Sequence, residues 1–236
     1  MEKLLVFLIV TCFSFSIHAQ SIIGAWETTS TSENGAPLKS VIIFADGYQA
    51  SATYNADTGK FINTNGGTWK LEGDVMNKKI EFDTENPDRV GSKESFTVQI
   101  TDDEIEVVDL DQKFKRIDNG LPGKLQGDWL MSGRIRDGET QLRDTNRPRK
   151  TMKILSGTRF QWIAYNTETK QFMGTGGGTY TTKDGKYTEN IDFFSRDDSK
   201  AGLSLQFNYE LIDGQWHHSG LSSKGDPIHE IWSVRK

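Results

Sequence analysis

The feature that most constrains this chain is an internal repeat. Residues 54–82 and 165–193 align without a gap at a constant offset of 111 residues, and ten positions are identical, from Tyr54 and Tyr165 to Phe82 and Phe193. Similarity over that length predicts two copies of one folded unit. The chain has 236 residues, so each copy would have roughly 100 residues, the size of a small domain.

Each half opens with a Gly-x-Trp triplet, at residues 24–26 in the first half and 127–129 in the second. Between the halves, residues 117–124 contain an Asn-Gly pair and a Pro-Gly pair, which are strong turn signals. We therefore predict one domain over residues 20–118 and a second over residues 125–236.

Residues 1–19 have the pattern of a secretory signal peptide, with Lys3 before an apolar stretch and Ala19 before the expected cleavage point. The apolar stretch is too short for a comfortable membrane span. Cys12 is the only cysteine, so the mature protein is expected to have no disulfide, no thiol nucleophile and no cysteine metal ligand. A lipid anchor at Cys12 would need a small residue before it, where Thr11 stands. We expect a secreted or periplasmic protein, and an association with the cell envelope stays open.

Short apolar-alternating runs, broken by Gly, Asn and Asp, continue through both units. Asp-Gly pairs at residues 46–47, 184–185 and 213–214 suit tight hairpin turns, because both residue types tolerate positive φ angles. No segment has a sustained helical period. The pattern predicts an all-β protein with two tandem antiparallel up-and-down β-barrels, since closing each meander removes exposed sheet edges.

Composition and motifs exclude several classes of function. The net charge of −5 is wrong for a nucleic-acid-binding surface. The glycine-rich residues 174–178 lack the Lys-Ser/Thr and the helix of a phosphate loop, so they indicate a bulge or a close backbone approach. We expect no cofactor, and the sequence does not determine the oligomeric state.

Each unit resembles the lipocalins and related calycin barrels in two features. It begins with a Gly-x-Trp triplet and ends with a basic residue. The resemblance implies that Lys115 or Arg116 packs over Trp26, and that Arg235 packs over Trp129, as a cation–π lid on the base of each barrel.

The second unit is also similar to an uncharacterised family of secreted bacterial lipocalin-like domains. This similarity lies in residues 176–180, 187–189 and 216–220. It implies a barrel fold and export without a settled activity, and small apolar ligands enter only by analogy with classical lipocalins.

Tyr187 and Glu189 distinguish the two copies, because Met76 and Lys78 stand at the matching positions of the first unit. Strand alternation places both residues on the apolar face of their strand. This difference predicts a divergent first copy and a working second copy. An inward Glu189 would have a raised pKa and could act as an acid, a base or a ligand anchor. The alternative is that Glu189 pairs with an arginine inside a filled core.

His217 and His218 are adjacent on one strand, so only one of them can face the cavity; His218 shares its face with Trp216. Together with His229 they show no metal-ligand spacing, and we expect no metal site. The basic residues of 133–150 predict a long loop over the barrel mouth, which is either a lid for an acidic ligand or an ordinary solvated loop.

These patterns favour a protein that binds a small, partly apolar and anionic ligand in its second barrel. The expected ligand-binding residues are Trp162, Tyr180, Tyr187, Glu189, Tyr209 and His218. One alternative is a barrel enzyme that uses Glu189 and a histidine for acid–base chemistry on a lipid- or sugar-derived substrate. Another is a structural envelope module whose barrels are filled. Catalytic residues cannot be assigned from the sequence.

Overall fold

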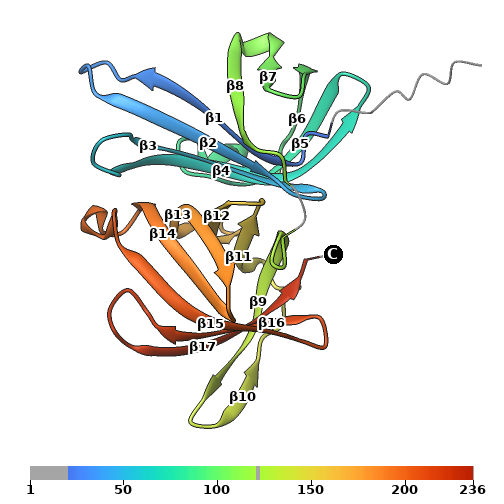
Figure 1. Ribbon diagram of the computed structural model, residues 1–236. Coiled ribbons are helices and arrows are strands. Elements are labelled where there is room, and N and C mark those ends of the chain that lie inside the picture. The colour runs from blue at the N-terminus through green and yellow to red at the C-terminus, as the bar shows by residue number, and fades with distance from the viewer. Residues whose placement is uncertain (1–20, 121–122, 236) are drawn as a thin grey trace, which may run out of the picture.

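The computed structural model of the protein describes residues 21–120 and 123–235, and the signal peptide predicted over residues 1–19 lies outside them. The described chain forms two antiparallel β-barrels stacked one on the other (Figure 1), which confirms the predicted fold class. Its only helical pieces are three short 3₁₀ turns, η1 (Pro87–Arg89), η2 (Val108–Leu110) and η3 (Asp198–Lys200). No helix among the described residues is long and apolar enough to cross a membrane.

The first barrel closes because its last strand pairs with its first. Its strands are β1 (Gly24–Thr31), β2 (Pro37–Phe44), β3 (Tyr48–Asn55), β4 (Phe61–Glu72), β5 (Val75–Asp83), β6 (Lys93–Ile100), β7 (Glu104–Val107) and β8 (Gln112–Asp118).

The second barrel closes in the same way, through β17 and β9. Its strands are β9 (Gly127–Arg136), β11 (Arg149–Leu155), β12 (Arg159–Asn166), β13 (Phe172–Lys183), β14 (Lys186–Phe194), β15 (Ser204–Ile212), β16 (Gln215–Leu221) and β17 (Pro227–Val234). A ninth strand, β10 (Glu139–Leu142), pairs only with β9 and projects as a hairpin (Figure 1).

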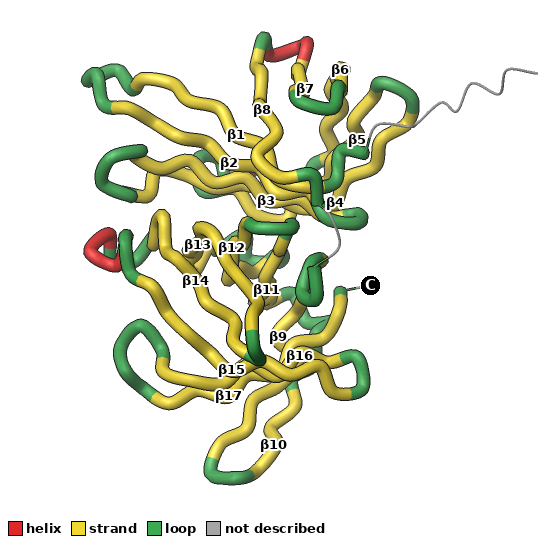
Figure 2. The backbone as a smooth tube through the Cα atoms, viewed as in Figure 1, coloured by secondary structure: helices red, strands yellow, loops and turns green. Residues whose placement is uncertain are grey.

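This hairpin corrects the prediction of one long loop over residues 133–150. Asp137 and Gly138 have φ angles of 53° and 81°, so this Asp-Gly pair makes a tight turn with two positive φ angles, like the pairs at 184–185 and 213–214. At the predicted turn between β13 and β14, Asp184 and Gly185 have φ angles of 51° and 72°. Figure 2 shows these turns as short loops between long strands.

The glycines shared by the two repeats have an architectural role. The strand register shifts between Gly66 and Gly67 in β4 and between Gly177 and Gly178 in β13. A Cβ on Gly67 would lie 2.0 Å from the Lys79 carbonyl oxygen, and a Cβ on Gly178 would lie 2.0 Å from the Asn190 carbonyl oxygen. A side chain is excluded at both positions, which confirms the predicted bulge with close backbone approach.

The repeated segments also form the contact between the barrels. Tyr54 stacks on Phe193 with a centroid distance of 4.9 Å, and the equivalent pair, Tyr165 and Phe82, lies at 4.8 Å. Phe61 and Phe172, which are equivalent to each other, stack at 5.9 Å. Each of these tyrosines thus contacts the phenylalanine of the other barrel, and the same contact recurs in the opposite direction, as in a two-fold symmetric dimer. The two units therefore pack as a pseudo-dimer within one chain.

This contact explains the unbroken apolar run of residues 41–44 in β2. In β2, Ile42 and Phe44 line the interior of the first barrel, whereas Val41 and Ile43 belong to the apolar cluster between the barrels. Met152 and Ile154 of β11 face them from the second barrel in the same cluster. Residues 41–44 of β2 therefore face a barrel interior on one side and the contact between the barrels on the other, and the usual apolar–polar alternation is lost there.

The tryptophan at the base of each barrel makes the same hydrogen bond. Trp26 Nε1 donates to the Ile22 carbonyl, and Trp129 Nε1 donates to the Leu125 carbonyl, each at 2.9 Å. The Arg116 guanidinium lies 3.8 Å from the centre of the Trp26 ring, which confirms the expected lid on the first barrel.

The corresponding expectation for Arg235 and Trp129 is wrong. Arg235 stacks at 3.9 Å over the ring of Tyr48, in the first barrel, and its Nη2 lies 2.7 Å from Glu81 Oε1. It also donates to the Tyr165 hydroxyl at 3.0 Å. The end of β17 faces the contact between the barrels, where a carboxylate and an aromatic ring satisfy the guanidinium.

Candidate functional site

The second barrel encloses a cavity of about 400 Å³. Its wall receives side chains from every strand of the closed barrel except β13, and the largest are aromatic. The lining residues used below are Arg143, Arg149, Lys153, Trp162, Glu189, Phe194, Arg196, Phe207, His218, Glu230 and Trp232.

A buried ion pair crosses the inside of this barrel. Lys153 Nζ of β11 lies 2.7 Å from Glu189 Oε1 of β14, and the two side chains are only 5% and 6% exposed. The lysine nitrogen also lies 5.0 Å from the centre of the Tyr187 ring and 4.9 Å from that of Trp216. A buried charge is retained only when a partner offsets the cost of removing it from water. Glu189 therefore points inward as predicted, but its partner is a lysine and not an arginine.

A second polar pair lies beside the first. His218 Nδ1 is 3.2 Å from Glu230 Oε2, which also accepts a hydrogen bond from Trp232 Nε1 at 3.2 Å. Burial, followed by the positive charge of Lys153, lowers the pKa of His218, so its imidazole is neutral at neutral pH. Burial alone would raise the pKa of Glu230, but the hydrogen bonds from His218 and Trp232 and the charge of Lys153 lower it overall. The site thus holds a carboxylate beside a neutral imidazole.

Three polar atoms under the cavity have no hydrogen-bond partner among the described residues: the Tyr187 hydroxyl, Trp216 Nε1 and His218 Nε2. Their rings touch one another, with centroids 5.1–5.6 Å apart. Burial and then the Glu189 carboxylate raise the pKa of Tyr187 well above its usual value. An unpaired buried donor or acceptor costs about 1–3 kcal/mol. A cluster of three such atoms indicates a place where a water molecule or a ligand group is accommodated.

The structure brings three of the six predicted binding residues to the cavity wall: Trp162, Glu189 and His218. Tyr187 is fully buried below them, against the His218 ring at 5.6 Å between centroids.

Tyr180 and Tyr209 face the barrel interior but belong to its packed core and do not line the cavity. Tyr180 donates a hydrogen bond of 2.6 Å to the Ser156 carbonyl. Tyr209 lies opposite His218 in the strand pairing and is 8% exposed. The structure therefore places these two tyrosines outside the cavity lining, and their contact with a ligand stays a prediction.

The adjacent histidines divide between the two faces of β16. His218 lines the cavity, whereas His217 Nδ1 lies 3.2 Å from His229 Nε2 on the other face. Among the described residues, no group of three or more His, Cys, Asp and Glu side chains has the arrangement of a metal site.

Lys153, Glu230 and Arg196 were not predicted from the sequence. Lys153 interrupts the otherwise apolar residues 152–155, so a charged residue inside an apolar run was the available signal for it. Glu230 follows His229 and is not marked in this way. Arg196 follows β14, donates to the Met173 carbonyl and lies 5.9 Å from the Trp162 ring centre. No comparable pattern marks it.

The fold and the cavity define a protein of two closed antiparallel eight-stranded barrels with a cavity of about 400 Å³ in the second. Residues 124–235 match a protein family described as a domain of unknown function (DUF4488). The match covers the second barrel, which contains the cavity described above. No curated protein matches the chain.

Proposed function

We propose that the second barrel is a binding cup for a small molecule with an apolar body and an anionic group. The observation that carries this proposal is the cavity of about 400 Å³, which falls within the range of roughly 300–1,000 Å³ usual for small-molecule sites. Its aromatic wall and few polar groups are also typical of such sites.

The charges at the cavity favour an anion. Four basic side chains line it, Lys153 and three arginines, against two acidic ones, Glu189 and Glu230. Glu189 already neutralises Lys153, so the arginines carry the excess.

Arg143 and Arg149 line the cavity and are exposed to solvent, which puts them at its mouth. Burial, followed by the charges of Arg149 and Arg134, lowers the pKa of Arg143. Like charges near one another raise the free energy of the site, and an anion bound beside them would lower it. The anionic group is therefore placed at the mouth, with the apolar body against Trp162, Phe194 and Phe207.

A lipocalin-like, exported carrier is the biological form that we propose. It rests on the Gly-x-Trp triplets, the closed eight-stranded barrels and the signal-like residues 1–19. A secreted or periplasmic location would suit a carrier of scarce small molecules.

The test uses 8-anilinonaphthalene-1-sulfonate, an aromatic anion whose fluorescence rises in apolar sites. We expect saturable binding that weakens at least tenfold in Arg143→Ala/Arg149→Ala, because the mouth loses two charges. Arg136→Ala is the control, since that side chain is 66% exposed in the hairpin and should change the affinity less than twofold. Equal binding by the double variant would contradict the proposal.

A native mass spectrum of protein from its own host would identify a retained ligand directly. Glu189→Gln separates a binder from an enzyme acting on that ligand. A binder should lose a modest part of its affinity, whereas an enzyme should lose turnover by orders of magnitude.

A further inference from the structure

We propose that the first barrel holds a second binding site, for a small molecule with a carboxylate at one end of an apolar body, anchored by Lys78. This site is distinct from the one in the second barrel. A cavity of about 270 Å³ lies inside the first barrel. Its lining is mainly apolar and includes Trp26, Phe44, Met76, Phe96, Val98 and Phe114.

Lys78 brings a cation into this apolar cavity. It lies on β5, where the second barrel has Glu189, and its Nζ is 5.9 Å from the centre of the Phe96 ring. In the described part of the chain no carboxylate oxygen lies within 4.0 Å of its amino group. In contrast to Lys153, Lys78 therefore has no ion-pair partner among the described residues.

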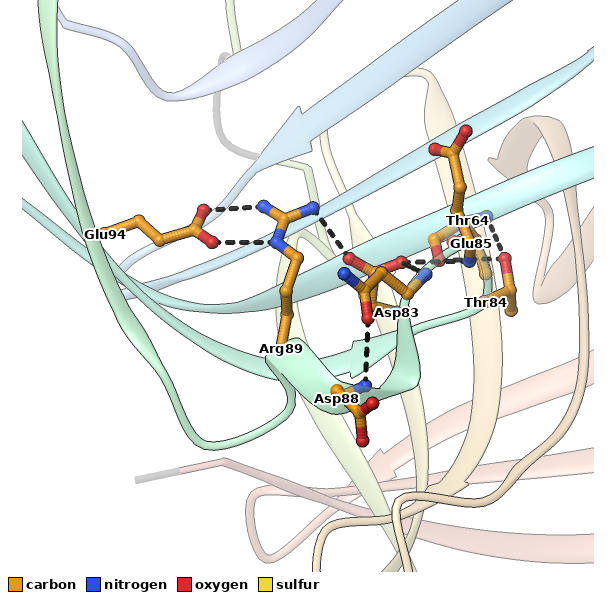
Figure 3. Close-up of polar contacts among 8 residues, drawn as sticks. Thr64, Asp83, Thr84, Glu85, Asp88, Arg89 and Glu94 are labelled. Carbon is orange, nitrogen blue, oxygen red and sulfur yellow. Dashed lines mark hydrogen bonds and ion pairs between the residues drawn. The ribbon is translucent and has the colours of Figure 1, made fainter.

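The other cation at the cavity is already engaged. Arg89 Nη1 lies 2.8 Å from Asp83 Oδ2, and its Nε and Nη2 donate to the two oxygens of Glu94 at 2.7 and 2.6 Å (Figure 3). A fork-like pair of this kind fixes the guanidinium. Lys78 is thus the basic group available to a ligand.

Gln49 supplies a second unused donor to the same cavity. Its side chain is on β3, 1% exposed, and its amide nitrogen has no hydrogen-bond partner among the described residues. Leaving such a donor unpaired costs about 1–3 kcal/mol. An amide donor and a lysine facing one apolar space are the groups that a carboxylate would satisfy.

The surroundings of Lys78 predict how binding depends on pH. Burial lowers the pKa of Lys78 to about 8; the Arg89 charge acts in the same direction, and Glu94 and Asp83 oppose it. The amino group is charged at neutral pH at a cost in desolvation, and a bound carboxylate offsets that cost. Affinity for an anion should therefore be high below pH 8 and fall as the pH rises through that value.

The experiment uses decanoate, with decanol as its uncharged counterpart, followed by the tryptophan indole N–H signals in NMR. Trp26 lines the first cavity, and Trp162 and Trp232 line the second, so the two sites report separately. We expect decanoate to shift the Trp26 signal in the wild-type protein and also in Arg143→Ala/Arg149→Ala. Failure of the second-barrel site and failure of this one are thus distinguishable.

Lys78→Met should weaken the decanoate effect on Trp26 at least tenfold, while Lys78→Arg keeps most of it. Lys79→Met, at an exposed position on the same strand, should change it less than twofold. Raising the pH from 6.5 to 9.5 should weaken binding to the wild type at least fivefold. Decanol should bind wild type and Lys78→Met alike, which also shows that the variant is folded. Decanoate that shifts only Trp162 and Trp232, or binds Lys78→Met as it does the wild type, would overturn the proposal.

Discussion

The two barrels share their architecture and differ in the residues that face their cavities. Strand pairing makes four positions equivalent, and the second barrel has a charged or ionisable residue at each of them. Lys153, Glu189, His218 and Glu230 correspond to Ile42, Lys78, Val107 and Gln112. At these positions the second barrel thus has a lysine–glutamate ion pair and a histidine–glutamate hydrogen bond, where the first has a single lysine.

The residues that the copies share lie elsewhere. The repeated tyrosines and phenylalanines form the contact between the barrels, and the repeated glycines form the bulges. The internal sequence similarity therefore reflects the barrel architecture and the symmetric contact between the two barrels. The specific chemistry is found at positions where the copies diverge, so each barrel is expected to select its own ligand.

The largest effect is expected from Lys153, the cation for which the first barrel has Ile42. Lys153→Met would leave Glu189 without its partner among aromatic rings. We expect the free energy of unfolding to fall by about 3–5 kcal/mol in urea denaturation, because an unpaired buried charge is strongly destabilising.

The double variant Lys153→Met/Glu189→Met removes both charges and should recover most of that loss, since apolar side chains often replace a buried ion pair at little cost. Ile42→Met is the matched control in the first barrel and should cost less than about 1.5 kcal/mol. A double variant no more stable than Lys153→Met would show that the two residues are not coupled.

The second-largest effect is expected at the contact between the barrels, where two equivalent carboxylates each accept from an arginine and a tyrosine. Glu81 accepts from Arg235 and from the Tyr165 hydroxyl, and the equivalent Asp192 accepts from Arg159 and from Tyr54. The Arg235–Glu81 pair is 7% and 13% exposed, whereas the Arg159–Asp192 pair is 16% and 33% exposed.

Glu81→Gln should therefore lower the free energy of unfolding by about 2–3 kcal/mol and Asp192→Asn by about 1 kcal/mol, since water screens and replaces the more exposed pair better. Urea denaturation of the two variants side by side measures the difference. Equal losses in the free energy of unfolding would contradict this prediction and would mean that the two ion pairs contribute equally despite their different exposure.

The sequence predicted the repeat, the strands, the closed barrels and the inward direction of Glu189, because each depends on local turn chemistry or on alternation. Alternation separates inside from outside but does not give the height of a residue along the barrel axis. For that reason Tyr180 and Tyr209 were expected at the cavity, although they lie in the packed core.

The partners of the site residues depend on long-range geometry. Lys153 and Glu189 are 36 residues apart, and Arg235 and Glu81 are 154 residues apart. The contact between barrels redirected Arg235 away from Trp129, and a single repeat unit contains no information on that contact.

The smallest effect concerns Asp128, where the first barrel has Ala25. Asp128 is 4% exposed, and its Oδ1 has no hydrogen-bond partner among the described residues. Burial raises the pKa of this carboxyl to about 8; Asp46 and Glu81 add to the rise, and Arg235 opposes it. The folded protein therefore holds this proton at neutral pH, while the unfolded chain releases it near pH 4.

A carboxyl whose pKa is raised by folding contributes stability below its unfolded pKa and loses it as the pH rises towards the folded pKa. Asp128→Asn keeps the shape and does not titrate, so it should match the wild type near pH 4 and exceed it by on the order of 2 kcal/mol at pH 8. Urea denaturation at both pH values measures this, with the exposed Asp102→Asn as the control. A gap that does not change between pH 4 and pH 8 would contradict a buried, protonated Asp128. Ala25 occupies the same position in the first barrel, so the fold does not need a carboxyl there. A stabilisation of Asp128→Asn that grows with pH would show that the buried carboxyl destabilises the second barrel, and the first barrel has no such group.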